Sequence, residues 1–164
     1  MEINTLKDLL VHSLQDAYSA EKQIIKGLPK MAKAASHPEL KKAFETHLME
    51  TEKQKENLER ILEMLGARPG RMKCKAMEGL IEESKELLEE DVEEDVLDAG
   101  LINAAQKIEH YEIATYGTAR AYAELLGEKE VEKMISQILE EEKKTDVLLT
   151  KLALATINLE AVNA

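Results

Sequence analysis

Hydrophobic residues recur every three or four positions along four long stretches of the chain. This spacing places them on one face of a helix and predicts amphipathic α-helices. The first stretch repeats from Leu6 through Leu10 and Leu14 to Met31. The same pattern predicts long helices over about 5–34, 38–65, 95–126 and 129–158, and a shorter helix over about 72–88.

The lengths of the connections predict how these helices are joined. The first and second long helices, and likewise the third and fourth, are separated by only a few residues, so each pair is expected to be antiparallel. The second and third are separated by about 30 residues, enough to run the length of a bundle. We therefore predict an all-α, ferritin-like antiparallel four-helix bundle with a long crossover that contains a short fifth helix. One such domain is expected over 1–164.

Each long helix interrupts its own apolar stripe with glutamate near its middle. The interruptions are Glu21, Glu50, Glu109 with Glu112, and Glu142. Burying an unpaired carboxylate is unfavourable, and a lone glutamate in such a stripe usually reaches solvent from its edge. Four helices that make the same exception at the same depth instead favour one shared layer of carboxylates in the core.

Cations would neutralise such a layer, and two metal ions in a carboxylate cage are the expected solution. Carboxylates suit iron and manganese, and a histidine nitrogen favours a transition metal over calcium or magnesium. His47 lies one turn before Glu50 and is the candidate nitrogen ligand or, alternatively, a partner that positions a carboxylate. Asp146, Tyr18 and Tyr116 are candidates for a further ligand or for hydrogen bonds to one.

Composition narrows the classes of function. The formal charge of −11 argues against nucleic-acid binding, which needs a positive surface, and suits either cation capture or ordinary solubility. The lone cysteine, Cys74, and the absence of a secretory pattern at the start predict a cytoplasmic protein. No run of apolar residues is long enough for a membrane span, so no membrane partner is expected.

Five segments of the chain resemble the YciF/YciE family of bacterial stress-response proteins, and its YciF branch most. They read LQDAYSAEKQ over 14–23, HLMETE over 47–52, KCKAMEGLIEE over 73–83, AQKIEHYEIATYG over 105–117 and LEEEKKTD over 139–146. The resemblance implies a ferritin-like fold with a dinuclear metal centre, a homodimer and a role in stress response. It also implies that the five glutamates of the stripes fall where ferritin-like proteins place metal ligands.

The chain departs from the Glu-x-x-His motif of rubrerythrin-like proteins. The motif would place a histidine three positions after each of two glutamates. Here Lys53 stands three positions after Glu50, and Thr145 three positions after Glu142, so both histidines of the motif are absent. Three functions stay open. The first is a di-iron or di-manganese oxidoreductase that acts on hydrogen peroxide or oxygen, which includes ferroxidase and catalase-like activity. The second is a metal-sequestering protein without turnover, and the third is a structural bundle. No residue is assigned a catalytic role.

Overall fold

The computed structural model describes residues 2–164, and over that range the chain forms helices and no strand. The helices are α1 (Leu6–Ala34), α2 (Pro38–Met64), α3 (Lys75–Glu89), α4 (Glu94–Leu125), α5 (Lys129–Leu152) and α6 (Asn158–Val162). A π-helical turn, Ala153–Ile157, joins α5 to α6. The fourth long helix was expected to reach residue 158, whereas the regular α-helix ends at Leu152, where this wider turn begins. The predicted fold class is confirmed.

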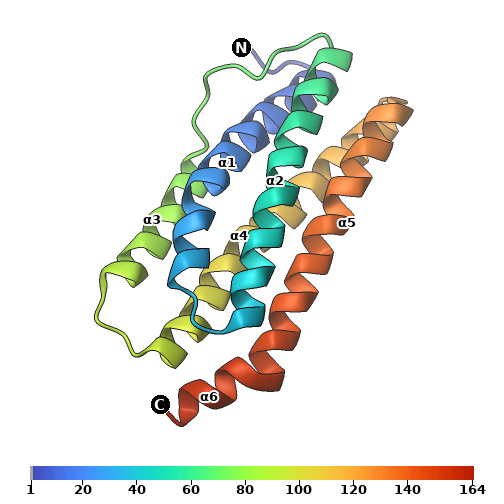
Figure 1. Ribbon diagram of the computed structural model, residues 1–164. Coiled ribbons are helices and arrows are strands. Elements are labelled where there is room, and N and C mark those ends of the chain that lie inside the picture. The colour runs from blue at the N-terminus through green and yellow to red at the C-terminus, as the bar shows by residue number, and fades with distance from the viewer. Residues whose placement is uncertain (1) are drawn as a thin grey trace.

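The four long helices form the bundle, and α3 lies outside it (Figure 1). α1 packs against α2, α4 against α5, and the two hairpins meet through α2 with α5 and α1 with α4. α3 belongs to the long connection between α2 and α4, and it packs against α1 and α4. A Cβ added at Gly27 would lie 2.8 Å from the end of the Ile81 side chain, and one at Gly100 would lie 3.0 Å from Leu87. These two glycines therefore let α3 approach the bundle closely.

Two helix starts are held by acidic side chains. At α1, Thr5 accepts a hydrogen bond from the Asp8 amide and the Asp8 carboxylate accepts one from the Thr5 amide, forming a capping box. At α2 the acceptor comes from another helix. The buried Asp98 carboxylate of α4 accepts hydrogen bonds from the amides of Ser36 and His37, at 2.9 and 2.7 Å.

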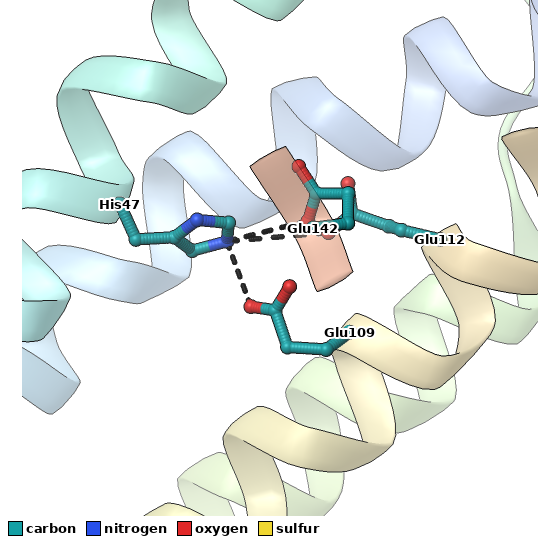
Figure 2. Close-up of side chains that lie close together, drawn as sticks. All are labelled: His47, Glu109, Glu112 and Glu142. Carbon is teal, nitrogen blue, oxygen red and sulfur yellow. Dashed lines mark ion pairs between the residues drawn. The ribbon is translucent and has the colours of Figure 1, made fainter. Parts of the chain in front are cut away.

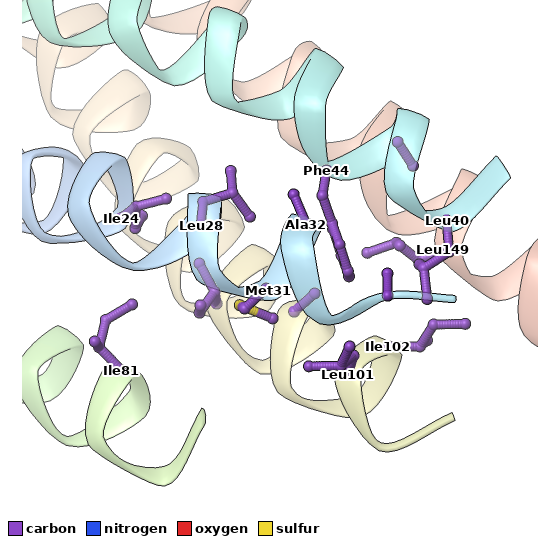
Figure 3. Close-up of a cluster of buried hydrophobic side chains, with 14 of the residues drawn as sticks. Ile24, Leu28, Met31, Ala32, Leu40, Phe44, Ile81, Leu101, Ile102 and Leu149 are labelled. Carbon is purple, nitrogen blue, oxygen red and sulfur yellow. The ribbon is translucent and has the colours of Figure 1, made fainter. Parts of the chain in front are cut away.

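The core consists of two apolar clusters with a polar layer between them. The first, shown in Figure 3, is built from residues such as Leu28, Phe44 and Leu101, and the second from residues such as Leu14 and Leu58. Along every long helix the change from one cluster to the other coincides with buried polar residues. These are Glu21 on α1, His47, Thr51 and Gln54 on α2, Glu109 and Glu112 on α4, and Glu142 on α5. The fold thus positions one polar layer near the middle of the bundle.

None of the helices within residues 2–164 combines the length and the apolar character needed to cross a membrane.

Candidate metal centre

Four side chains from three helices converge in the polar layer. His47 of α2, Glu109 and Glu112 of α4, and Glu142 of α5 each offer a ligand atom, and these atoms lie within 4.8 Å of one another. Figure 2 shows the His47 ring facing the three carboxylates. All four residues are at least 97% buried. The helical repeat explains the pair on α4, because residues three apart lie on the same face.

The Nε2 atom of His47 is the nitrogen that faces the carboxylates. It lies 2.9 Å from Glu109 Oε1, 3.9 Å from Glu142 Oε2 and 4.0 Å from Glu112 Oε2. Its other nitrogen, Nδ1, lies 3.7 Å from Glu50 Oε2. That distance is too long for a hydrogen bond, and Nδ1 has no hydrogen-bond partner. In metal sites a carboxylate that bonds the far nitrogen orients the histidine ring, and Glu50 is the carboxylate nearest to that position.

Glu21 adjoins the same layer from α1. It is fully buried, and one of its oxygens accepts a hydrogen bond from the hydroxyl of Tyr116. Burial first, and then the charge of Glu142, raise the pKa of Glu21 to about 8. Burial first, and then the charges of Glu142, Glu21 and Glu109, raise the pKa of Glu112.

The other buried groups have similarly perturbed acidities. Burial raises the pKa of Glu109 and of Glu112 well above the usual 4.5, and the charge of Glu142 raises both further. Burial alone lowers the pKa of His47, but the charges of Glu109 and Glu142 outweigh it, so the pKa ends well above 6.5. Without a cation, burial and mutual repulsion therefore favour protonation of these carboxyl groups.

Several buried atoms of the layer have no hydrogen-bond partner. They include both carboxylate oxygens of Glu112, one oxygen each of Glu21, Glu109 and Glu142, and the Nε2 of His47, whose contact with Glu109 is not aligned as a hydrogen bond. Buried polar atoms without partners are rare because each is unfavourable. Unpartnered carboxylate oxygens and an imidazole nitrogen are the donors that iron or manganese takes. The residues present fit a metal centre.

Of the remaining predicted site residues, Tyr116 is buried against the layer, whereas Glu50, Tyr18 and Asp146 lie at its edge or outside it. Glu50 has a side chain 35% exposed and contacts the layer only through His47. The Tyr116 hydroxyl donates a hydrogen bond to Glu21 of the layer. The Tyr18 hydroxyl instead donates to Glu59, at 2.8 Å. Asp146 also lies outside, because its carboxylate contacts His110 of α4 at 3.1 Å.

The sequence reading missed Gln54. This fully buried side chain donates hydrogen bonds to Glu142 and to the neighbouring Glu141. It therefore fixes the orientation of one carboxylate in the layer. The available signal was its position in the apolar stripe of the second helix, one turn after Glu50.

Comparisons with known proteins agree with this architecture. The family described as a domain of unknown function, DUF892, matches residues 5–162. Protein YciF of Escherichia coli K12 is 48% identical over 164 residues, 99% of either chain. The crystal structure of this E. coli stress protein superposes with a TM-score of 0.91, covering 95% of this chain and 99% of that one.

Two further solved structures share the fold. YcfI from Rhodopseudomonas palustris, proposed to be a structural protein, is 43% identical, with a TM-score of 0.87 and coverage of 91% of this chain and 95% of its own. A ferritin-like, diiron-carboxylate protein from Bacillus anthracis is 16% identical, with a TM-score of 0.70 and coverage of 92% and 99%. At that identity the second likeness concerns the fold alone.

Proposed function

Because the chain belongs to the family of YciF-like proteins described as DUF892, we propose that it is a bacterial stress-response protein that binds two metal ions. Iron is the first choice and manganese the second, since carboxylates with one imidazole suit both. The observation that carries the proposal is the convergence of four buried donor side chains, several of whose atoms have no other partner.

The charges of the layer support two ions rather than one. His47 and Glu109 form one end, and Glu21 with its Tyr116 hydrogen bond forms the other. Glu112 and Glu142 each lie within 4.0 Å of His47 Nε2 and would hold the ions together with Glu109 and Glu21. Carboxylates from facing helices hold metal pairs in other helical bundles. Glu50 is assigned to the outer side of His47, where it orients the ring or completes its end of the centre.

The reaction we propose is oxidation linked to oxygen or peroxide, including ferroxidase activity. A pair of ferrous ions would supply two electrons, which with two protons convert hydrogen peroxide to two water molecules or dioxygen to hydrogen peroxide. The chain's own residues bind the ions, keep them in a layer closed from water, and hold a proton at the Tyr116 hydroxyl beside Glu21. Gln54 keeps one carboxylate oriented.

Metal content tests this proposal. Protein loaded anaerobically with ferrous iron is expected to carry about two ions per chain, measured by elemental analysis. The double variant Glu109→Gln with Glu142→Gln preserves shape and should retain less than half of that iron. Glu140→Gln is the matched control, because this exposed side chain lies on α5 like Glu142 and forms an ion pair with Lys143 rather than with the layer. Circular dichroism checks that all proteins keep their helices.

Two outcomes would overturn the metal centre. One is wild-type protein that binds neither iron nor manganese under anaerobic loading, and the other is a double variant that keeps full occupancy. Either would favour the structural bundle, in which protons rather than cations neutralise the layer. The raised pKa values of Glu21, Glu109 and Glu112 make that alternative chemically reasonable.

A homodimer belongs to the same proposal. Large apolar side chains are exposed in the π-helical turn and in α6, among them Leu154 at 70% and Val162 at 81%. Leu159 lies on the same terminal segment, 59% exposed. Exposed apolar groups gathered on one segment are typical of surfaces that another chain covers.

A further inference from the structure

A surface groove between α2 and α5 leads to the metal centre. These two helices lie side by side and bring the two hairpins of the bundle together (Figure 1). The groove has a volume of about 390 Å³, and its wall includes the partly exposed Glu50 and the buried His47 of the centre. Solvent in the groove therefore approaches the centre from the side of His47.

The second ring nitrogen of His47, Nδ1, lies on the side of Glu50. The His47 side chain is 4% exposed, and its Nδ1 atom has no hydrogen-bond partner and lies 3.7 Å from Oε2 of Glu50. This distance is too long for a hydrogen bond, whereas two ligands that each lie about 2.1 Å from one shared metal ion are separated by about 3 to 4 Å. Buried nitrogens without a partner are rare because they are unfavourable. The two atoms are therefore spaced to hold an ion between them.

Glu141 of α5 adds a second partly exposed carboxylate beside Glu50. Gln54 lies one turn after Glu50 on α2, so these two side chains are neighbours. The amide nitrogen of Gln54 donates to Oε2 of Glu141 at 2.8 Å and also to the buried Glu142. One amide group thus joins a carboxylate near the surface to a carboxylate of the centre, next to Glu50.

Glu50 and Glu141 are not neutralised by basic side chains. Within residues 2–164 neither of them forms an ion pair with a lysine or arginine. Burial raises the pKa of Glu141 and the hydrogen bond from Gln54 lowers it, while the charge of Glu50 raises it more than the charge of Lys53 lowers it. A divalent cation would relieve this repulsion, and carboxylates with one imidazole nitrogen suit iron and manganese.

We propose that Glu50 and Glu141, together with Nδ1 of His47, form an outer site that captures ferrous or manganous ions from the groove and delivers them to the centre. Nδ1 binds the entering ion while the ring proton is on Nε2, beside Glu109. Once Nε2 binds an ion of the centre, the proton is on Nδ1 and Glu50 accepts it. The outer site then lacks its nitrogen ligand, so it holds ions in transit and does not store them. The proposal rests on the proposed function, since the ions are delivered to that centre.

The rate of manganese uptake tests this route. The loss of the EPR signal of free Mn²⁺ in rapidly frozen samples follows uptake by metal-free protein. Glu141→Gln removes the charge but keeps a side-chain oxygen for the Gln54 amide, so it should slow uptake about tenfold and leave the final content at about two ions per chain. Glu140→Gln is the matched control, because it removes the same charge one position away, from a side chain that pairs with Lys143. Its rate should stay within about twofold of wild type.

Crystals test the outer site directly, without reference to activity. The double variant Glu109→Gln with Glu142→Gln lacks two donors of the centre but keeps all three groups of the outer site. After a manganese soak it should show one anomalous peak bounded by Glu50, Glu141 and Nδ1 of His47, and adding Glu141→Gln should abolish that peak. If the double variant does not fold, a short soak of metal-free wild-type crystals provides the same measurement.

Several results would overturn the outer site. They are equal uptake rates for wild type and Glu141→Gln, equal slowing by Glu140→Gln, and the absence of a peak beside Glu50. A final content that falls in Glu141→Gln would also do so, because Glu141 would then support the centre and not the entry of ions. Each of these leaves the proposed function standing as long as wild-type protein binds two ions. Wild-type protein that takes up no ion at the centre overturns the proposed function, and the delivery role with it.

Discussion

The metal-free protein is expected to lose stability as the pH rises, and Glu21→Gln should remove much of that loss. The pKa of Glu21 is raised from its ordinary 4.5 to about 8, by burial and then by Glu142. Between these two values the folded protein holds a proton that the unfolded chain has released. Stability is therefore fully present below about pH 4.5 and falls until the pH passes about 8. At up to about 1.4 kcal/mol per pH unit, the whole window is worth about 5 kcal/mol.

The other groups of the layer act in the same direction. The folded-state pKa values of Glu109, Glu112 and His47 are also raised, so each binds protons more readily in the folded protein. The assay is urea unfolding of metal-free wild type and Glu21→Gln at pH 5, 6, 7 and 8. The variant should show a slope against pH that is shallower by up to about 1 kcal/mol per unit, and should be more stable than wild type at pH 8.

The refuting result is equally definite. Equal slopes for the two proteins, or a variant less stable than wild type at pH 8, would mean that Glu21 is not held protonated by its surroundings. Saturating manganese supplies an internal check, because metal binding requires deprotonated donors. The ion should raise wild-type stability more at pH 8 than at pH 5 and should have a smaller effect on Glu21→Gln.

Two further substitutions separate the scaffold from the site. Asp98→Ala removes the acceptor for the amides of Ser36 and His37 and should lower the free energy of unfolding by about 3 kcal/mol, measured by chemical denaturation. Elemental analysis should find the metal content per folded chain unchanged. Gln54→Leu leaves Glu142 without its amide donor and should weaken manganese binding about tenfold, measured by calorimetric titration, while the helical circular dichroism signal persists. An unchanged affinity for manganese would show that this hydrogen bond does not orient a ligand.

The helices could be predicted because burial in a bundle repeats with the period of the helix. Leu10, Leu14 and Leu28 are predicted core positions on the first helix, and all are buried. The end of α5 could not be predicted in the same way. The residues Ala153–Ile157 continue an apolar helical pattern, whereas the chain there forms a wider π-helical turn before α6, which packs against α4.

The same periodicity explains why the predicted site residues divide. Glu21, Glu109, Glu112 and Glu142 occupy the centres of their stripes and are buried together. On α2 the buried positions run through His47, Thr51 and Gln54, so Glu50 is displaced to the edge of the stripe, where its side chain is 35% exposed. A stripe read only in steps of three and four allows both Glu50 and Thr51 after His47. Packing within the bundle buries Thr51 and leaves Glu50 at the edge, and that information is not local.

The position of the polar layer, in the middle of the bundle, couples metal binding to folding. The carboxylates separate two apolar clusters that the same four long helices must close, so the charge of the layer acts on the whole bundle rather than on one surface. Protons neutralise it only below the raised pKa values, whereas cations neutralise it most effectively above them. If the centre holds metal, the ions stabilise the helices where protons no longer do. The difference in unfolding free energy with and without manganese should then grow with pH, which a structural bundle that merely retains buried acids would not show.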